Sequence, residues 1–425
     1  MRCRLANWYV IFSCACVPAS AWSAETPQAW VQRNLVEIVE FYRQLHTNPE
    51  LSFQEKETAA RLVQRWRDAG IQVTPGIGGH GVVGILSNGD GPTVMLRSDM
   101  DALPVREATG LVYASTVTVQ NETGAQVGVM HACGHDIHMA NLTGVARYLS
   151  ENQNLWKGTL MLIGQPAEER GAGAAAMLKD GLFERFSKPD YAVALHVVAY
   201  RTGYSLANVD SVDIKVHGRG GHGAYPHTAI DPIVQAAELV MSLQTIVSRE
   251  VKPMEPAVVT VGSIHGGTKH NVIGDTCELQ LTVRSYTDEV RTQIHNAIRR
   301  RAKAIATVYN APDAEVDISE GTPSLWNDPN LSRRPARVFQ RVIRKHNVAE
   351  AEPSMGGEDF SRYGQAGIPI LMFRLGAVDG KRLERFQQIG QPPPSLHSPA
   401  FYPDAEDTFK TGITVLASVA LELLQ

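Results

Sequence analysis

The chain has few cysteines, no long run of like charge and no low-complexity segment. Five cysteines occur in 425 residues, and three of them, Cys3, Cys14 and Cys16, lie near the start. The two that remain are too few for a disulfide-rich scaffold. A formal net charge of −4, from 40 basic and 44 acidic residues, argues against a nucleic-acid-binding protein. The length and the 44% hydrophobic content suit a globular protein of about two domains.

The N-terminal residues predict a secretory signal peptide over residues 1–21. Arg2 and Arg4 provide a basic start, and residues 8–17 are apolar. Small residues precede the cleavage expected after Ala21, and cleavage after Ala24 is the second choice. The apolar stretch is too short for an ordinary membrane span, so we expect none. A lipoprotein signal that uses one of the cysteines in this stretch is the alternative. We therefore expect an exported protein, periplasmic or secreted.

Short apolar stretches alternate with helical patterns along most of the chain. Strands are expected at residues 82–86, 93–96, 159–164, 192–195 and 368–373. Polar residues directly follow several of these strands, and ligands of α/β sheets bind beyond the carboxyl ends of the strands. The pattern predicts an α/β fold with a layered, mostly parallel sheet and a single site at those strand ends.

The pattern changes between residues 208 and 317. Apolar and polar residues alternate at 212–216, as in a half-exposed strand. The order strand–helix–strand–strand–helix–strand in this region predicts a small α+β unit of ferredoxin-like type. We expect residues 208–317 to form a second domain that is inserted into a first domain made of residues 22–207 and 318–425.

Residues 130–138, MHACGHDIH, concentrate a thiol, three imidazoles and a carboxylate in one short stretch. Cys133 and His135 are two residues apart, so in a strand or loop both side chains could reach one metal ion. Thiolate and imidazole together suit zinc or another first-row divalent ion. A buried cysteine among hydrogen-bonded histidines is the alternative, but it leaves the rest of the stretch unexplained. Cys133 could also pair with Cys277, although a metal-binding role would exclude that disulfide.

Further polar residues extend this set at the predicted strand ends. In chain order, the set comprises Asp99, Asp101, Cys133, His135, Glu168, Glu169, His196 and His397. It is rich enough to hold two metal ions, and a two-metal hydrolytic site also needs a free carboxylate as proton shuttle. Glu168 and Glu169 could divide the work of metal ligand and shuttle. Paired glutamates are ordinarily a solvated face, but this pair ends an apolar strand.

Seven stretches, in order along the chain, carry a resemblance to a known family. They are RSDMDALP at 97–104, HACGHD at 131–136, QPAEE at 165–169, GRGGHG at 218–223, NVI at 271–273, GGEDF at 356–360 and LHSP at 396–399. On these motifs the chain resembles the M20 metallopeptidase/amidohydrolase superfamily. Within it, the chain is similar to the amidohydrolase branch of aminoacylases, hippurate hydrolases and auxin-conjugate amidohydrolases.

The resemblance implies a role for each residue of the metal site. Two divalent ions, of zinc, manganese or cobalt, would be bound by Cys133, His135, Glu169, His196 and His397. Glu168 would act as general base and acid, and Asp101 would orient the site from behind the ligands. Asp99 stands where several relatives have a ligand histidine, so we do not assign it to a metal.

The resemblance also implies that residues 22–207 and 318–425 form a catalytic metallohydrolase domain and that residues 208–317 form a lid or dimerisation domain. His222 would reach the scissile carbonyl, often across a dimer interface in this family. Asn271 and Arg284 would hold the substrate carboxylate, for which the planar guanidinium fork is well suited. A turn histidine without a task and an ordinary exposed arginine are the alternatives for His222 and Arg284.

The expected function is metal-dependent hydrolysis of N-acyl amino acids, including N-aroyl ones, to a carboxylic acid and a free amino acid. The expected partners are such small molecules or short peptides, and a second copy of the chain in a homodimer or higher homo-oligomer. A dipeptidase or carboxypeptidase of the same superfamily is the first alternative. A catalytically silent binding protein is the second, and Glu168 argues against it because binding alone needs no proton shuttle.

Overall fold

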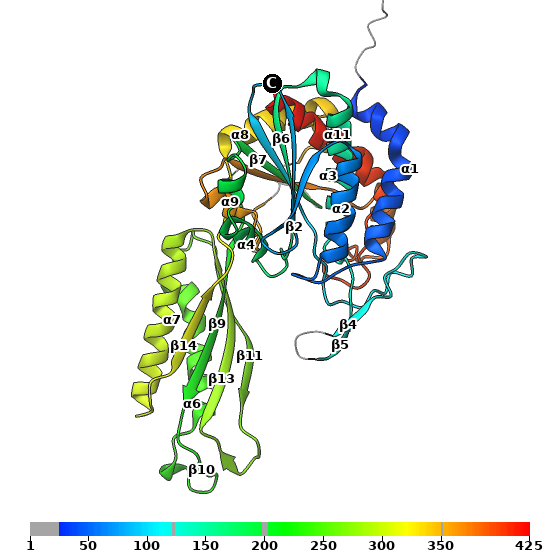
Figure 1. The fold of residues 1–425 in the computed structure, drawn as a ribbon. Coiled ribbons are helices and arrows are strands. Elements are labelled where there is room, and N and C mark those ends of the chain that lie inside the picture. The colour runs from blue at the N-terminus through cyan, green and yellow to red at the C-terminus, as the bar shows by residue number, and fades with distance from the viewer. Residues whose placement is uncertain (1–24, 121–123, 198–202, 350–351) are drawn as a thin grey trace, which may run out of the picture.

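The computed structural model describes residues 25–120, 124–197, 203–349 and 352–425 of the chain. The predicted signal peptide therefore lies outside the described residues. Figure 1 shows a larger unit in which helices surround a sheet, and an elongated smaller unit that extends away from it. In the described residues, no helix combines the length and apolar character needed to cross a membrane.

The larger unit is built on a six-stranded sheet. In spatial order its strands are β1 (Gln72–Ile77), β2 (Gly81–Asn88), β6 (Gly158–Gln165), β3 (Thr93–Asp99), β7 (Tyr191–Val197) and β16 (Ile370–Leu375). The pairings among β6, β3, β7 and β16 are parallel, whereas β1–β2 and β2–β6 are antiparallel. The predicted α/β class with a mostly parallel sheet is confirmed.

Helices cover both faces of this sheet. One face carries α1 (Pro27–His46), α2 (Lys56–Asp68), α3 (His135–Glu151), α8 (Pro329–Ile343) and α11 (Ala405–Leu423), and the other carries α4 (Gly173–Lys179), α5 (Leu182–Arg185) and α9 (Ser361–Gln365). Trp30, Trp66 and Phe409 are buried in the first layer, and Met177 and Tyr363 in the second. Both faces of the sheet are thus dry, which explains why its strands read as continuous apolar runs.

The smaller unit has its own sheet and its own core. Its antiparallel strands in spatial order are β11 (Ala257–Gly266), β13 (Thr276–Ser285), β9 (Asn208–His217) and β14 (Glu315–Glu320), with α6 (Pro232–Arg249) and α7 (Asp288–Val308) on one face. Alternate residues of β9, such as Val212 and Ile214, are buried under the helices. The last strand of this unit, β14, ends at Glu320.

Shorter elements complete the fold. They are the hairpin of β4 (Thr118–Gln120) and β5 (Gln126–Gly128), the pair β8 (Gly203–Leu206) and β15 (Leu325–Asn327), the pair β10 (Gly221–His222) and β12 (Val272–Ile273), helix α10 (Gly380–Gln388), and 3₁₀ helices at Gln153–Leu155, Pro226–Thr228 and Lys345–Asn347. β1 and the β4–β5 hairpin were not predicted. Pro75 and Gly76 lie within β1 and conceal it, since proline is tolerated at a sheet edge but gives no strand signal.

Candidate active site

The predicted site residues gather at the carboxyl ends of three neighbouring strands. β3 ends at Asp99, β6 at Gln165 and β7 at Val197, and these three strands lie side by side in the order β6, β3, β7. Parallel strands present their carboxyl ends at one edge of the sheet. Residues separated by almost a hundred positions therefore meet there, as the strand-end pattern predicted.

Two groups of metal-binding side chains share Cys133. In the first group, ligand atoms of Cys133, His135 and His196 lie within 4.8 Å of one another. In the second, the same holds for Cys133, Glu169 and His397. The thiol can therefore contribute to two adjacent ions, which is the arrangement of a dinuclear site.

Hydrogen bonds fix which ring nitrogen each histidine presents. His135 Nδ1 donates to the backbone carbonyl of Asp101 at 2.8 Å, and His196 Nδ1 donates to the carbonyl of Val197 at 3.2 Å. Each bond leaves Nε2 as the acceptor nitrogen, and His196 Nε2 lies 3.6 Å from Cys133 Sγ. Such outer hydrogen bonds orient metal-binding imidazoles and set their tautomer.

The buried ligand atoms fit divalent cations. His135 Nε2 and Glu169 Oε1 have no hydrogen-bond partner among the described residues, although both are buried. Burial raises the pKa of the Cys133 thiol well above its usual range and that of Glu169 to about 7. A cation placed among these groups would favour their ionised forms. Sulfur, nitrogen and carboxylate donors together suit zinc, manganese or cobalt.

Two carboxylates hold the turn that carries Glu168 and Glu169. The Asp101 carboxylate accepts the amide of Glu168 at 3.1 Å and that of Glu169 at 3.0 Å. The buried Glu55 carboxylate accepts the amide of Ala167 at 2.8 Å. Ala167 has φ 50°, a conformation that costs a non-glycine residue free energy and persists only where neighbouring contacts hold it.

A second strained residue is the candidate ligand His397. Its φ is 67°, and its amide donates to the carbonyl of Ala132 at 2.8 Å. This bond ties the C-terminal loop to the residue before Cys133. Its side chain is 56% exposed, so His397 lies at the mouth of the site rather than in its floor.

A cleft of about 590 Å³ opens over these ligands and is also lined by the smaller unit. Arg284, from β13, lines it and donates from Nη1 to the carbonyl of Met355 at 2.7 Å. Burial lowers the pKa of the Arg284 guanidinium, and among the described residues no carboxylate lies within ion-pair distance of it. The side chain thus offers unused donors to a ligand in the cleft.

Residues 95–422 match peptidase family M20/M25/M40. The chain belongs to this family. N-acetyl-L-cysteine deacetylase of Bacillus subtilis is 39% identical over 77% of both chains. Thermostable carboxypeptidase 2 of Saccharolobus solfataricus is 37% identical over 91% of this chain and 95% of that one. A solved Bacillus subtilis structure, described as a dinuclear metal-binding M20 peptidase, has a TM-score of 0.75 at 30% identity, covering 92% of this chain and 99% of that one.

The predicted membership of the amidohydrolase branch is confirmed by these relatives. The chain is accordingly a metal-dependent M20 amidohydrolase, which cleaves amide bonds.

The M20 site is backed by polar residues that the sequence did not assign. Asp99 accepts from Arg97 at 2.8 Å and from His138 Nδ1 at 2.7 Å, while His138 Nε2 accepts the Val197 amide at 3.1 Å. Both nitrogens of His138 are thus used, although Asp99, His135 and His138 are close enough to hold an ion. Their bonds connect the strand ends of β3 and β7 behind the ligands.

Buried Arg97 also binds Glu358 at 2.9 Å and Asp359 at 3.1 Å. Arg97 directly follows the predicted apolar strand at residues 93–96. A charged residue at that position was the signal that could have revealed this cluster. Of the other residues in the 130–138 stretch, Asp136 accepts from His46 Nδ1 at 2.7 Å, and His131 is buried without a hydrogen-bond partner among the described residues. Cys133 and Cys277 are both free thiols.

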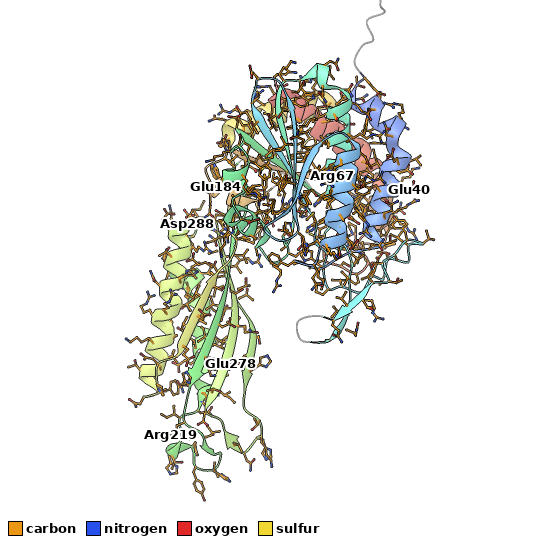
Figure 2. The ribbon with its side chains drawn as sticks, in the orientation of Figure 1. Glu40, Arg67, Glu184, Arg219, Glu278 and Asp288 are labelled. Carbon is orange, nitrogen blue, oxygen red and sulfur yellow. The ribbon has the colours of Figure 1, made fainter. Side chains whose placement is uncertain are left out.

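The structure does not bring His222 and Asn271 to this cleft within one chain. His222 lies in β10, and the Asn271 carbonyl accepts the Gly223 amide beside it. Figure 2 shows Arg219, three residues before His222, at the end of the smaller unit farthest from the larger one. From Thr276 to Arg284, β13 alone extends about 27 Å at the usual rise per residue. Arg284 is therefore at the cleft, and the other two are at the remote tip.

Proposed function

We propose that this M20 enzyme hydrolyses the amide bond of N-acyl amino acids, releasing a carboxylic acid and a free amino acid. The observation that carries the proposal is the position of Arg284. A guanidinium without a carboxylate partner among the described residues faces the cleft that holds the metal ligands. A substrate with a free α-carboxylate would supply the missing partner and direct its amide toward the ligands.

Glu168 is the proposed proton shuttle. When bound, two divalent ions would supply an acidified water and polarise the scissile carbonyl. Burial, followed by the charge of Glu358, raises the pKa of Glu168 well above its usual range, so this carboxyl can hold a proton. Glu168 would take the proton of the attacking water and return it to the leaving amine. Asp101 would keep Glu168 and Glu169 in register through their backbone amides.

We further propose a homodimer in which each chain completes the other's site. His222 and Asn271 would enter the cleft from the partner subunit, because in their own chain they lie at the remote tip. Their contact would stabilise the oxyanion and the substrate carboxylate. The exposed face of α6 supports this assembly: Ile233, Ala237 and Met241 form an apolar stripe at four-residue spacing, and Met241 is 70% exposed.

A carboxypeptidase is the second candidate, since a relative of that name is 37% identical over nearly the whole chain. Both activities need a free α-carboxylate, and they differ in whether the acyl group is that of a simple carboxylic acid or an aminoacyl or peptidyl group. We also propose that the protein is exported, on the signal-peptide pattern of residues 1–21.

A substrate screen tests the proposal. Metal-free protein would be refilled separately with zinc, manganese and cobalt, then offered N-acetyl and N-benzoyl amino acids, unblocked dipeptides, and N-acyl amino acid amides. We expect hydrolysis of the acylated acids and little of their amide-capped analogues. Faster cleavage of unblocked dipeptides would favour the carboxypeptidase, and no hydrolysis with any metal would contradict the proposed function.

A further inference from the structure

Glu358 is a buried carboxylate that uses only one of its two oxygens within the fold. Its side chain is 2% exposed and lines the cleft. Its Oε1 accepts hydrogen bonds from Arg97 Nη2 at 2.9 Å and from the Phe360 amide at 3.0 Å. Oε2 accepts no hydrogen bond from the described residues. A buried acceptor without a donor costs free energy, which a donor on a bound substrate would recover.

This carboxylate lies beside the proposed proton shuttle. Ligand oxygens of Glu358 and Glu168 lie within 4.8 Å of each other. Two carboxylates at that separation favour a ligand group that carries hydrogen or positive charge between them. The leaving nitrogen of an amide is such a group, because it holds a hydrogen in the substrate and gains a second one from Glu168.

The segment from Met355 to Glu358 follows the amino-acid part of the proposed substrate. At its start, the Met355 carbonyl accepts from Arg284 Nη1 at 2.7 Å, so this end lies at the proposed anchor of the α-carboxylate. The glycines 356–357 line the cleft without side chains, and Glu358 ends the segment beside Glu168. In an N-acyl amino acid, the α-carboxylate, the Cα atom and the scissile nitrogen follow in the same order. Glu358 is therefore the residue opposite the nitrogen.

We infer that Glu358 accepts a hydrogen bond from the scissile N–H and thereby selects nitrogen over oxygen as the leaving atom. The inference rests on the proposed function, in which Arg284 anchors the α-carboxylate and Glu168 moves the proton. Water adds to the carbonyl carbon, one of its protons passes through Glu168 to the nitrogen, and the carbon–nitrogen bond breaks to give a carboxylic acid and an amine. Glu358 moves no proton. Its hydrogen bond strengthens once the nitrogen is protonated, so the contact acts mainly on kcat.

The variant Glu358→Gln removes the free acceptor and keeps the contacts with the fold. Arg97 and the Phe360 amide are donors, so they hold the carbonyl oxygen of the new side chain at the position of Oε1. The amide NH₂ then replaces Oε2 and cannot accept from the substrate. Losing a hydrogen bond to a charged group typically costs roughly 10- to 100-fold.

A matched pair of substrates tests the contact on the metal-loaded enzyme. N-acetyl-L-alanine and O-acetyl-L-lactate differ only in whether NH or oxygen joins the acetyl group to the acid. We expect Glu358→Gln to lower kcat for the amide by roughly 10- to 100-fold. The kcat for the ester and both KM values should stay nearly unchanged, and metal content should equal that of the wild type.

The wild type alone offers a second measurement, which does not depend on a variant. N-acetylglycine and N-acetylsarcosine are both amides, but the sarcosine nitrogen carries a methyl group in place of its hydrogen. We expect the wild type to hydrolyse N-acetylglycine with the higher kcat. In Glu358→Gln most of this advantage should disappear.

Two control variants separate the contact from the charge of its surroundings. Glu352→Gln makes the same chemical change at an exposed position that does not line the cleft, so it should leave every substrate unaffected. Asp359→Asn removes a charge that also binds Arg97, at 3.1 Å, from a residue that does not line the cleft. It should therefore change the amide and the ester by the same factor.

Three results would overturn the inference. They are unchanged hydrolysis of the amide by Glu358→Gln, an equal loss with amide and ester, which would indicate a structural role, and a selective loss of the amide in Asp359→Asn as well. Each result leaves N-acyl hydrolysis by the wild type intact, so the proposed function would stand. Absence of hydrolysis of every N-acyl amino acid by the wild type would instead contradict the proposed function itself.

Discussion

Substitutions of Glu55 test how the fold holds the turn that carries Glu168 and Glu169. Its carboxylate is fully buried, accepts the Ala167 amide at 2.8 Å, and leaves its second oxygen without a hydrogen-bond partner among the described residues. Glu55→Gln keeps an oxygen acceptor but cannot ionise. Glu55→Ala removes the acceptor, so the buried amide of Ala167 loses its hydrogen-bond partner. The strained backbone at Ala167, before Glu168, is then no longer held in place.

The pH dependence follows from the ionisation of Glu55. Burial raises its pKa from 4.5 to about 7. Between these values the folded protein keeps a proton that the unfolded chain has released, so this group lowers stability as pH rises. The full decrease in the free energy of unfolding is about 3 kcal/mol. About 2 kcal/mol of it develops between about pH 5 and pH 7.5. Relative to Glu55→Gln, the wild type should lose that amount over this interval.

Denaturation of metal-loaded wild type and both variants at the two pH values measures this difference. Because metal binding and other ionisations are common to the proteins, the comparison isolates Glu55. Glu55→Ala should be less stable than the wild type by about 1–3 kcal/mol, and its kcat should fall while Glu55→Gln stays active. A constant difference between wild type and Glu55→Gln at both pH values would refute the reasoning, as would full activity of Glu55→Ala.

Three further predictions concern the cleft and the smaller unit. Glu168→Gln should keep its metal and lose activity by roughly 10²- to 10⁴-fold, whereas Glu169→Gln should lose metal affinity. Measuring metal content together with activity distinguishes the two variants. Arg284→Ala should raise KM by roughly 10- to 100-fold for substrates with a free carboxylate and barely affect amide-capped analogues. His222→Ala should lower kcat by roughly 10²- to 10³-fold with metal content unchanged. Mixing the His222→Ala and Glu168→Gln variants should restore part of the activity. If no activity returns although the subunits are shown to exchange, a site shared between chains is contradicted.

Local patterns were enough to predict the larger unit and its strand ends. The apolar runs before Asp99, Glu168 and His196 mark strands buried on both faces, and such runs read clearly in a sequence. Because parallel strands end at one edge, the pattern also predicted that these residues would meet. The position of the residues that follow these strands could therefore be predicted without any knowledge of long-range contacts.

The supporting residues could not be predicted in this way. Glu55 resembles any charged residue at a helix start, and its role depends on a bond to Ala167, 112 positions away. His138 had the composition of a ligand, and only its two hydrogen bonds show that both nitrogens are used. The wide separation of His222 and Asn271 from Arg284 depends on the direction of long strands, which short motifs do not record.

Metal content per chain tests the central claim most directly, because Cys133 belongs to both groups of ligands. Wild type, His196→Ala, His397→Ala and Cys133→Ala would be refilled with zinc, desalted and analysed. The account predicts about two ions in the wild type, about one in each histidine variant, and the loss of both in Cys133→Ala. A wild type without metal, or a Cys133→Ala variant that still binds two ions, would contradict it.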